Sequence, residues 1–210
     1  MSTENKREQV KEEIKEQAKE EVKKEAAQVN FESFNFNENI KRGIDAAGFK
    51  VASPIQALSI PLILDGRDMI GQAHTGTGKT AAFGLPTMNN MDFNSGVEIL
   101  VITPTRELAN QVSDELYMLG RYANVKTVTI YGGKSSRRQL DLVNRGAQIV
   151  VATPGRLLDL LSSKQLRNFN PKTVVLDEAD EMLDMGFLDD IKEIFSYIQE
   201  DRQTLLFSAT

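Results

Sequence analysis

The chain has 210 residues, and its 25 Lys and Arg against 30 Asp and Glu leave a formal net charge of −5. An apolar fraction of 40% is enough to bury a core, which excludes wholesale disorder, and the absence of Cys excludes a disulfide framework, a cysteine nucleophile and a thiolate metal site. The single histidine, His74, excludes a multi-histidine metal centre, and the acidic balance argues weakly against a nucleic-acid partner.

No apolar run approaches the length of a membrane span, and the first residues show no targeting segment. We therefore expect a cytoplasmic protein with no membrane partner. Residues 1–30 hold 7 Lys and Arg and 8 Glu, and small or apolar side chains recur every four positions, as at Val10, Ile14, Ala18 and Val22. This pattern predicts a charged N-terminal extension, helical or disordered, and a partner-binding helix is the alternative.

From residue 31 onward, short apolar runs alternate with helical patterns. Helices are expected in regions such as 107–121 and 187–200. The apolar runs are rich in Val and Ile and apolar on both faces, which is typical of parallel strands buried between helices. Residues 31–210 are therefore predicted to form an α/β domain that binds ligands beyond the carboxyl ends of its strands. The predicted strands are residues 69–72, 99–103, 127–131, 149–152, 173–176 and 204–207.

A phosphate-binding loop follows the first predicted strand. Residues 73–80 read Ala-His-Thr-Gly-Thr-Gly-Lys-Thr, a P-loop in which Ala73 replaces the usual first glycine. Gly76 and Gly78 let backbone N–H groups converge on a phosphate, Lys79 would reach the β- and γ-phosphates, and Thr80 would bind Mg²⁺. The loop predicts nucleotide binding, but a small-molecule kinase or a GTPase would carry a similar one.

Two carboxylates end the fifth predicted strand. Asp177 is placed to hold Mg²⁺ directly or through water, and Glu178 is placed to orient and deprotonate an attacking water. This pairing favours hydrolysis of a nucleoside triphosphate over transfer to a small substrate. The alternative is a solvated acidic turn, because residues 177–181 contain four acids, but a buried strand downstream of a P-loop makes that interpretation weaker.

These motifs, with others in the same order, resemble the DEAD-box ATP-dependent RNA helicases, and the pattern is that of a bacterial-type member. Asp177-Glu178-Ala179-Asp180 is the family's naming motif, and the resemblance covers residues 31–210. One departure is Ala52, where members often have Pro. The other matches are Gly48-Phe49 through Ser53-Pro54-Ile55-Gln56, which resembles the Q motif, then Pro104-Thr105-Arg106-Glu107-Leu108-Ala109, Gly132-Gly133, Thr153-Pro154-Gly155-Arg156 and Ser208-Ala209-Thr210.

The resemblance implies a RecA-like P-loop NTPase domain with a mainly parallel sheet and helices on both faces. It implies the first, ATP-binding lobe of an RNA helicase that couples ATP binding and hydrolysis to RNA duplex unwinding or remodelling. A second RecA-like lobe would follow Thr210, so we expect these residues alone to bind nucleotide weakly and to unwind nothing. An ATP-gated RNA clamp or scaffold is the alternative, and a DNA translocase is a third.

The resemblance also implies roles for individual residues in binding ATP and Mg²⁺. Gln56 would bond the adenine edge and Phe31 would stack on the adenine face, unless Phe31 is a core aromatic beside Phe34 and Phe36. Mg²⁺ would be held by Thr80 and Asp177, and catalysis would use Lys79, Asp177 and Glu178. The full ATP-binding set is Phe31, Gln56, Ala73, Thr75, Gly76, Thr77, Gly78, Lys79 and Thr80.

A second implied set faces RNA, and its members follow the predicted strands. Such groups contact phosphate and sugar rather than base edges, so binding would be sequence-independent and sensitive to salt. Lys134, Arg137 and Arg138 either add positive charge there or form a solvated helix face. Asp180, Ser208 and Thr210 would couple the ATP state to RNA, and ribonucleases or ribosome-assembly factors are candidate partners. The RNA-facing set is Pro104, Thr105, Arg106, Gly132, Gly133, Thr153, Pro154, Gly155 and Arg156.

Overall fold

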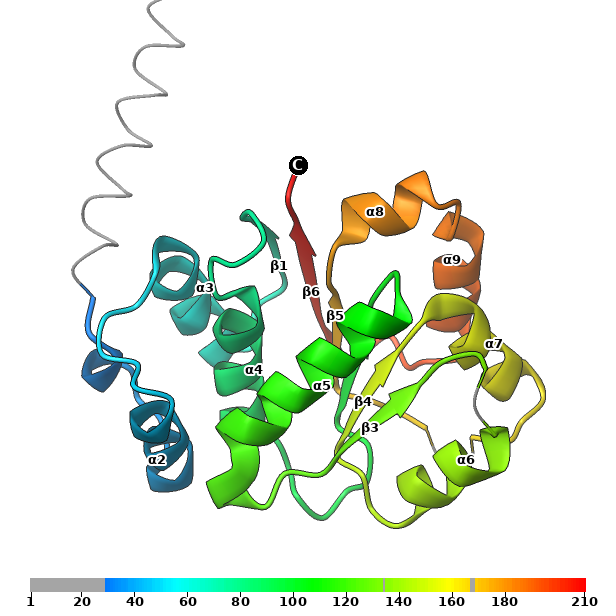
Figure 1. The fold of residues 1–210 in the computed structure, drawn as a ribbon, viewed down its shortest axis with the longest axis horizontal. Helices are drawn as coiled ribbons and strands as arrows, with labels where there is room; N and C mark the ends of the chain where they lie inside the picture. The colour runs from blue at the N-terminus through cyan, green and yellow to red at the C-terminus, as the bar shows by residue number, and fades with distance from the viewer. Residues whose placement is uncertain (1–28, 134, 167–168) are drawn as a thin grey trace, which may run out of the picture.

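A computed structural model of the chain describes residues 29–133, 135–166 and 169–210 (Figure 1). The extension predicted for residues 1–30 therefore lies almost wholly outside the described residues, as does Lys134. Within the described ranges, the helices are too short or too polar to cross a membrane. In chain order the elements are η1 (Phe31–Ser33), α2 (Glu38–Ala46), α3 (Pro54–Leu64), β1 (Met69–Gln72), α4 (Lys79–Asn90), β2 (Ile99–Ile102), α5 (Arg106–Gly120), η2 (Arg121–Ala123), β3 (Thr127–Ile130), α6 (Ser136–Asn144), β4 (Ile149–Ala152), α7 (Pro154–Ser162), β5 (Thr173–Leu176), α8 (Ala179–Asp184), α9 (Leu188–Ser196) and β6 (Gln203–Ser208).

The strands form one six-stranded sheet in the order β1-β6-β5-β2-β4-β3, and every neighbouring pair is parallel. All the strands predicted from the sequence are present, with ends that differ by at most one residue. The predicted α/β domain with a parallel sheet is confirmed. The helix expected at 187–200 is shorter, because α9 ends at Ser196 and the chain turns before β6.

Helices cover both faces of the sheet, as predicted (Figure 1). Alternate residues of each strand point to opposite faces, so Val101 and Val175 pack under α3, α4 and α5, whereas Leu100 and Val174 pack under α7, α8 and α9. Each face has its own buried apolar cluster. Because each strand is buried on both faces, its sequence is apolar throughout and does not alternate between apolar and polar residues.

Parallel pairing brings the carboxyl ends of all the strands to one edge of the sheet. The P-loop follows β1, the acidic motif follows β5, and the residues assigned to RNA follow β2, β3 and β4. The strand order places β6 and β5 between β1 and β2, so the acidic loop lies close to the P-loop. The fold thus gathers motifs that are far apart in the sequence along one edge.

Candidate functional site

The phosphate loop lies between β1 and α4, where its backbone turns sharply. Gly76 and Gly78 have φ angles of 81° and 86°, in the left-handed region that favours glycine. A Cβ added at Gly78 would lie 2.3 Å from the Gln56 Nε2 atom. The Ala73 N–H donates to the Ser208 carbonyl at 2.9 Å, which joins the start of the loop to β6. The loop therefore has the tight, glycine-dependent backbone that a phosphate cradle requires.

The Gln56 amide connects the start of α3 to this loop. Its oxygen accepts the Ser53 N–H at 2.8 Å, and its Nε2 donates to the Gly78 carbonyl at 3.1 Å. The Ser53 hydroxyl donates to the Thr77 carbonyl at 2.8 Å. A glutamine amide has two N–H donors and two oxygen lone pairs, so one donor and one lone pair of Gln56 are left after these two bonds. This remaining donor and lone pair are the groups with which Gln56 is predicted to bond an adenine edge.

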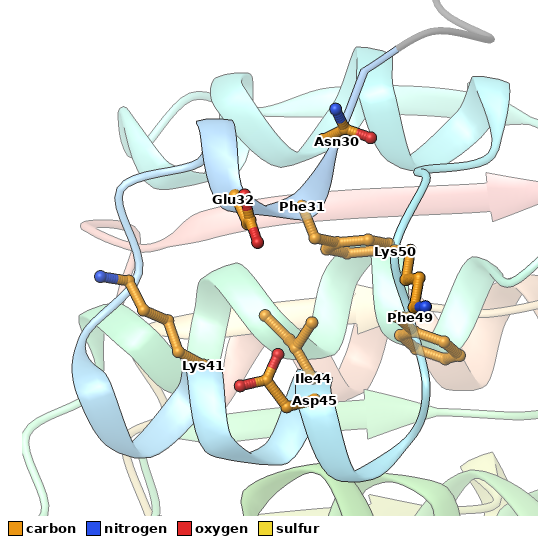
Figure 2. A pocket seen from close by; sticks show the side chains of 8 residues that line it. All are labelled: Asn30, Phe31, Glu32, Lys41, Ile44, Asp45, Phe49 and Lys50. Carbon is orange, nitrogen blue, oxygen red and sulfur yellow. The ribbon is translucent and has the colours of Figure 1, made fainter.

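Phe31 lies in an aromatic cluster of the core. It is 4% exposed, its ring stacks on Phe49 at a centroid distance of 5.5 Å, and it meets Phe34 edge to face at a centroid distance of 5.8 Å. This burial agrees with the core alternative, and the stacking of adenine on Phe31 stays a prediction. Phe31 also lines a hollow of about 620 Å³ that Gln56 does not line (Figure 2). That hollow is formed by Asn30, Phe31, Glu32, Lys41, Ile44, Asp45, Phe49 and Lys50.

The charged groups assigned to catalysis meet beside the P-loop. Lys79 Nζ is 2.9 Å from Glu178 Oε1, and both side chains are largely buried. The Thr75 hydroxyl donates to the same carboxylate oxygen at 3.3 Å. Glu178 adopts a φ of 57°, an uncommon conformation for a residue other than glycine, which turns the chain sharply into α8. Asp177 is 3% exposed, and its Oδ1 has no hydrogen-bond partner among the described residues.

Burial controls the ionisation of two carboxyl groups in this site. It raises the pKa of Asp177 from 3.8 to about 6, while the charge of Lys79 opposes that rise and the charge of Glu178 adds to it. Burial also raises the pKa of Glu115, and the nearby Thr80 side chain opposes that rise in part. The site is thus a poorly solvated place in which negative charge is disfavoured unless a cation compensates it.

One cavity of about 310 Å³ brings these groups together. The structure unites most of the predicted phosphate-binding residues with both carboxylates of the acidic motif. A hard cation with oxygen ligands fits here, because the buried Asp177 Oδ1 needs a partner and the Thr80 hydroxyl shares the cavity. Within the described residues, no group of three or more His, Cys, Asp or Glu could hold a metal ion, so a cation here would need most of its ligands from phosphates or water. The lining residues are Thr75, Gly76, Gly78, Lys79, Thr80, Leu108, Gln111, Val112, Glu115, Asp177 and Glu178.

Gln111 and Glu115 join this cavity although no sequence motif marks them. With Leu108 and Val112 they are spaced three or four residues apart on α5, so all four lie on one helix face. This helical spacing was the only signal in the sequence that could have grouped these residues. It predicts a shared face but not which element the face approaches, because the approach depends on how α5 packs against α4.

The residues assigned to RNA surround the ends of three adjacent strands, β2, β4 and β3. Thr105 caps α5 by accepting the Leu108 N–H at 3.2 Å. The Arg106 guanidinium lies against Gly133, where an added Cβ would be 2.7 Å from Nη1. Thr153 opens α7, whose first turn holds Pro154, Gly155 and Arg156. Pro104 and Pro154 are buried, so these two shape the backbone and offer little surface.

The residues assigned to coupling are in contact. Asp180 accepts the Thr210 N–H at 2.9 Å and the Thr210 hydroxyl at 2.7 Å through the same carboxylate oxygen. The Ser208 hydroxyl donates to the Thr210 carbonyl at 2.7 Å. The Thr210 hydrogen bond is the main reason that the pKa of Asp180 is lowered to about 2. The end of β6 is therefore joined to the acidic loop that follows β5.

Comparison with known proteins agrees with this arrangement. The DEAD/DEAH box helicase family model matches residues 53–210. The DEAD-box ATP-dependent RNA helicase RhpA of Helicobacter pylori is 54% identical over 181 residues, which cover 86% of this chain and 37% of RhpA. The DEAD-box ATP-dependent RNA helicase CshA of Bacillus subtilis is 50% identical over 183 residues, which cover 87% of this chain and 37% of CshA. The chain thus spans a little over a third of the length of these relatives.

A solved structure shows the same fold. The crystal structure of a DEAD box protein from the hyperthermophile Methanococcus jannaschii is 44% identical, has a TM-score of 0.83, and is matched over 86% of this chain and 50% of that chain. This likeness confirms the predicted RecA-like fold. From the ordered motifs, the sheet topology and these matches, the chain belongs to the DEAD/DEAH box helicase family.

Proposed function

We propose that residues 31–210 are the ATP-binding lobe of an ATP-dependent RNA helicase. The observation that carries this proposal is the cavity in which Lys79 and Thr80 of the P-loop face Asp177 and Glu178 of the acidic motif. RhpA and CshA, which this chain resembles, are named ATP-dependent RNA helicases. The complete protein would couple ATP binding and hydrolysis to the separation or remodelling of RNA duplexes.

The lobe would bind the phosphates of ATP through the N–H groups of the loop and through Lys79. Lys79 is paired with Glu178, so the incoming γ-phosphate competes for the ammonium group. Glu178, released from that pair, would then orient and deprotonate the attacking water. Thr80 and Asp177 would hold Mg²⁺, directly or through water, and when bound this ion would neutralise charge on the phosphates.

RNA would bind along the edge formed by the loops after β2, β3 and β4. Exposed Arg106 beside Gly133 and the N-terminus of α7 offer contacts to phosphate and sugar, not to base edges. Asp180, Ser208 and Thr210 would transmit the nucleotide state to this edge through their shared hydrogen bonds. Three further points stay predictions. They are the binding of Mg²⁺, partners such as ribonucleases or ribosome-assembly factors, and a cytoplasmic location.

Nucleotide binding tests the proposal directly. Titration of the 210-residue chain with a fluorescent ATP analogue and Mg²⁺ should give weak, saturable binding. Lys79→Ala should weaken that affinity by about 10- to 100-fold, because it removes charge-assisted bonds to the phosphates. Lys192→Ala, which alters an exposed lysine on α9, is the matched control. Equal affinity of Lys79→Ala and the unmodified chain would remove the P-loop from its assigned role.

We expect these 210 residues to unwind no RNA duplex by themselves. In related NTPases an arginine supplied from outside the P-loop domain accounts for about 10³–10⁵ in rate, and a second RecA-like lobe would supply such charges here. A strand-displacement assay with a short labelled RNA duplex and ATP measures unwinding by the chain. ATP-dependent strand separation by the chain alone would contradict the two-lobe mechanism.

A further inference from the structure

A groove of about 550 Å³ lies over β3 and shares no lining residue with the nucleotide cavity. β3 is the last strand at its end of the described sheet, and in Figure 1 it lies between α5 and α6. Residues 127–129 form the floor of the groove, and side chains of α5 and α6 form its two walls. The function proposed above gives this groove no role.

The backbone of β3 has hydrogen-bonding groups on its outer side. The Ile130 carbonyl faces β4, because it accepts the Thr153 N–H at 3.0 Å. In a parallel strand, successive residues direct their N–H and C=O groups to opposite sides. Thr127 and Thr129 are therefore turned away from β4, toward the side on which the described sheet ends. Such an edge can pair with one more strand.

Both walls of the groove are hydrogen-bonded to β3 or to its end. On the α5 side, the Ser113 hydroxyl donates to the Thr127 hydroxyl at 2.9 Å. On the α6 side, Gln139 Nε2 donates to the Tyr131 carbonyl at 3.1 Å. These bonds hold the two helices against the strand with the groove open between them, so a segment that enters meets a preformed site.

The α6 wall also contains a buried acceptor without a partner. Gln139 lines the groove and is 4% exposed, and its Oε1 accepts no hydrogen bond from the described part of the chain. A buried amide oxygen is unfavourable when it is left unpaired. An N–H group of a segment lying in the groove supplies the missing donor.

The walls carry opposite charges in one part of the groove and apolar side chains in another. Asp114 and Tyr117 of α5 and Arg138 and Leu142 of α6 line the groove and are exposed. Both helices connect parallel strands, so each runs from the carboxyl edge of the sheet back to its amino edge. Tyr117 and Leu142 therefore lie nearer the amino edge than Asp114 and Arg138.

We propose that this groove binds an extended peptide segment of a partner protein, which adds to β3 as a further strand. The backbone of the segment pairs with Thr127 and Thr129, and its side chains point alternately to α5 and to α6. The walls select its sequence: a basic side chain opposite Asp114, an acidic one opposite Arg138, and apolar ones nearer the amino edge.

A single strand fits this groove better than a second copy of the chain. Paired strands lie about 4.8 Å apart, whereas a helix with its side chains is about 10 Å wide. A second copy would bring its own α5 and α6 against the same two helices. A lone extended segment brings no helices and fits between the walls.

The probe for this site is a library of short random peptides displayed on phage and selected on the full chain. Enriched peptides should combine a basic and an acidic residue on opposite faces of a strand with apolar residues toward one end. Labelled copies of them are then titrated by fluorescence anisotropy. Thr129→Pro removes an outward N–H but no bond to β4, and proline is tolerated on edge strands. It should lower peptide affinity by about 10-fold or more.

Charge reversal tests the sequence preference without relying on the proline variant. Asp114→Lys should weaken binding of a selected peptide by about 3- to 10-fold, and exchange of the peptide's basic residue for Glu should restore it. Arg138→Glu should act in the same way on the acidic residue of the peptide. Asp141→Lys, at an exposed position of α6 that does not line the groove, is the control and should leave the affinity unchanged.

Amide hydrogen exchange, followed by NMR, locates the bound peptide on the strand edge. A bound strand should slow exchange at the N–H groups of Thr127 and Thr129. The N–H of Val128, which faces β4, should change little. This pattern separates strand addition from binding elsewhere on the surface.

Three results would overturn the inference. One is that no peptide is enriched, or that enriched peptides bind Thr129→Pro as tightly as the unmodified chain and leave amide exchange unchanged. Another is a dimer of the unmodified chain that Thr129→Pro abolishes, which would make a second copy the occupant. The third is that Arg138→Glu weakens RNA binding while no peptide is enriched, which would assign the groove to RNA.

Discussion

At the residue scale, the cavity beside the P-loop holds charged side chains in poorly solvated surroundings. Lys79 and Glu178 form a close pair at 2.9 Å, whereas Asp177 is 3% exposed and has an oxygen without a partner among the described residues. The left-handed φ of 57° at Glu178 adds backbone strain at the same point. Groups arranged for a ligand in this way destabilise the empty protein, as active sites commonly do.

Asp177→Asn is therefore expected to stabilise the protein in EDTA. The pKa of Asp177 in the folded protein, about 6, lies above the usual value of 3.8, so ionised Asp177 disfavours folding. The contribution of Asp177 to the free energy of unfolding is most favourable below pH 3.8, where the carboxyl group is protonated in both states. This contribution is lost as the pH rises through about 6. At pH 8 the variant should exceed the unmodified chain by on the order of 2–3 kcal/mol in free energy of unfolding, and the gap should shrink towards pH 4. Thermal denaturation across this pH range measures the gap.

The exposed carboxylate Asp201 provides the control for that experiment. Asp201→Asn should leave the free energy of unfolding within about 0.5 kcal/mol of the unmodified chain. A variant Asp177→Asn that is less stable at pH 8 would show that attraction to Lys79 outweighs the burial of the carboxylate.

At the element scale, α2 supports the helix that carries part of the site. Asn37 caps α2 by accepting the N–H groups of Asn39 and Ile40, each at 3.1 Å. The buried stripe of Ile40, Gly43 and Ile44 faces the core, and Gly43 lies directly against the backbone of α5. Since α5 begins at the loop assigned to RNA and carries Glu115, the docking of α2 helps to set the position of both.

Gly43→Ala should destabilise the fold by about 1–3 kcal/mol or more, because an added Cβ would lie 2.0 Å from the Leu119 carbonyl oxygen, and backbone cannot move aside cheaply. This exceeds the gain of up to about 1 kcal/mol that alanine brings to a helix interior. Urea denaturation gives the change in free energy. The exposed Asn39→Ala in the same helix is the control and should stay within about 0.5 kcal/mol. Equal urea midpoints for Gly43→Ala and the unmodified chain would show that α2 and α5 can move apart without loss of stability.

At the scale of the whole molecule, the net charge of −5 hides an uneven distribution. The acids assigned to the nucleotide site and the arginines assigned to RNA lie along one edge of the sheet, placed there by parallel pairing. Local placement, not total charge, decides which ligand each part of that edge attracts. The acidic composition of the whole chain is therefore no argument against nucleic acid at the arginines of this edge.

Single-stranded RNA should bind the chain weakly, with similar affinity for uridine-rich and mixed sequences, because the contacts reach phosphate and sugar. Affinity should fall with salt, and Arg106→Ala should reduce the slope of log affinity against log salt by roughly 0.7, the value for one phosphate contact. Fluorescence anisotropy at several salt concentrations measures this. Arg145→Ala, at the exposed end of α6, is the control. An unchanged slope in Arg106→Ala would remove this residue from the RNA-binding set.

Much of the fold and of the site could be predicted from local patterns. The strands were predictable because parallel strands buried on both faces must be short, apolar runs. Gly76 and Gly78 were predictable because a phosphate cradle needs backbone conformations that glycine adopts easily. The motifs and their order were enough to indicate the family, and most of these motifs follow strands that end at one edge of the sheet.

Other features depend on contacts between residues far apart in the chain. The burial of Phe31 against Phe49, the pairing of Lys79 with Glu178 and the place of Glu115 in the cavity beside the P-loop have no local signature. Local sequence patterns were enough to predict the strands, the P-loop and the edge of the sheet where the motifs gather. Which charged groups meet depends on the packed fold, because burial and distance arise only when α5, the P-loop and the end of β5 pack around one cavity.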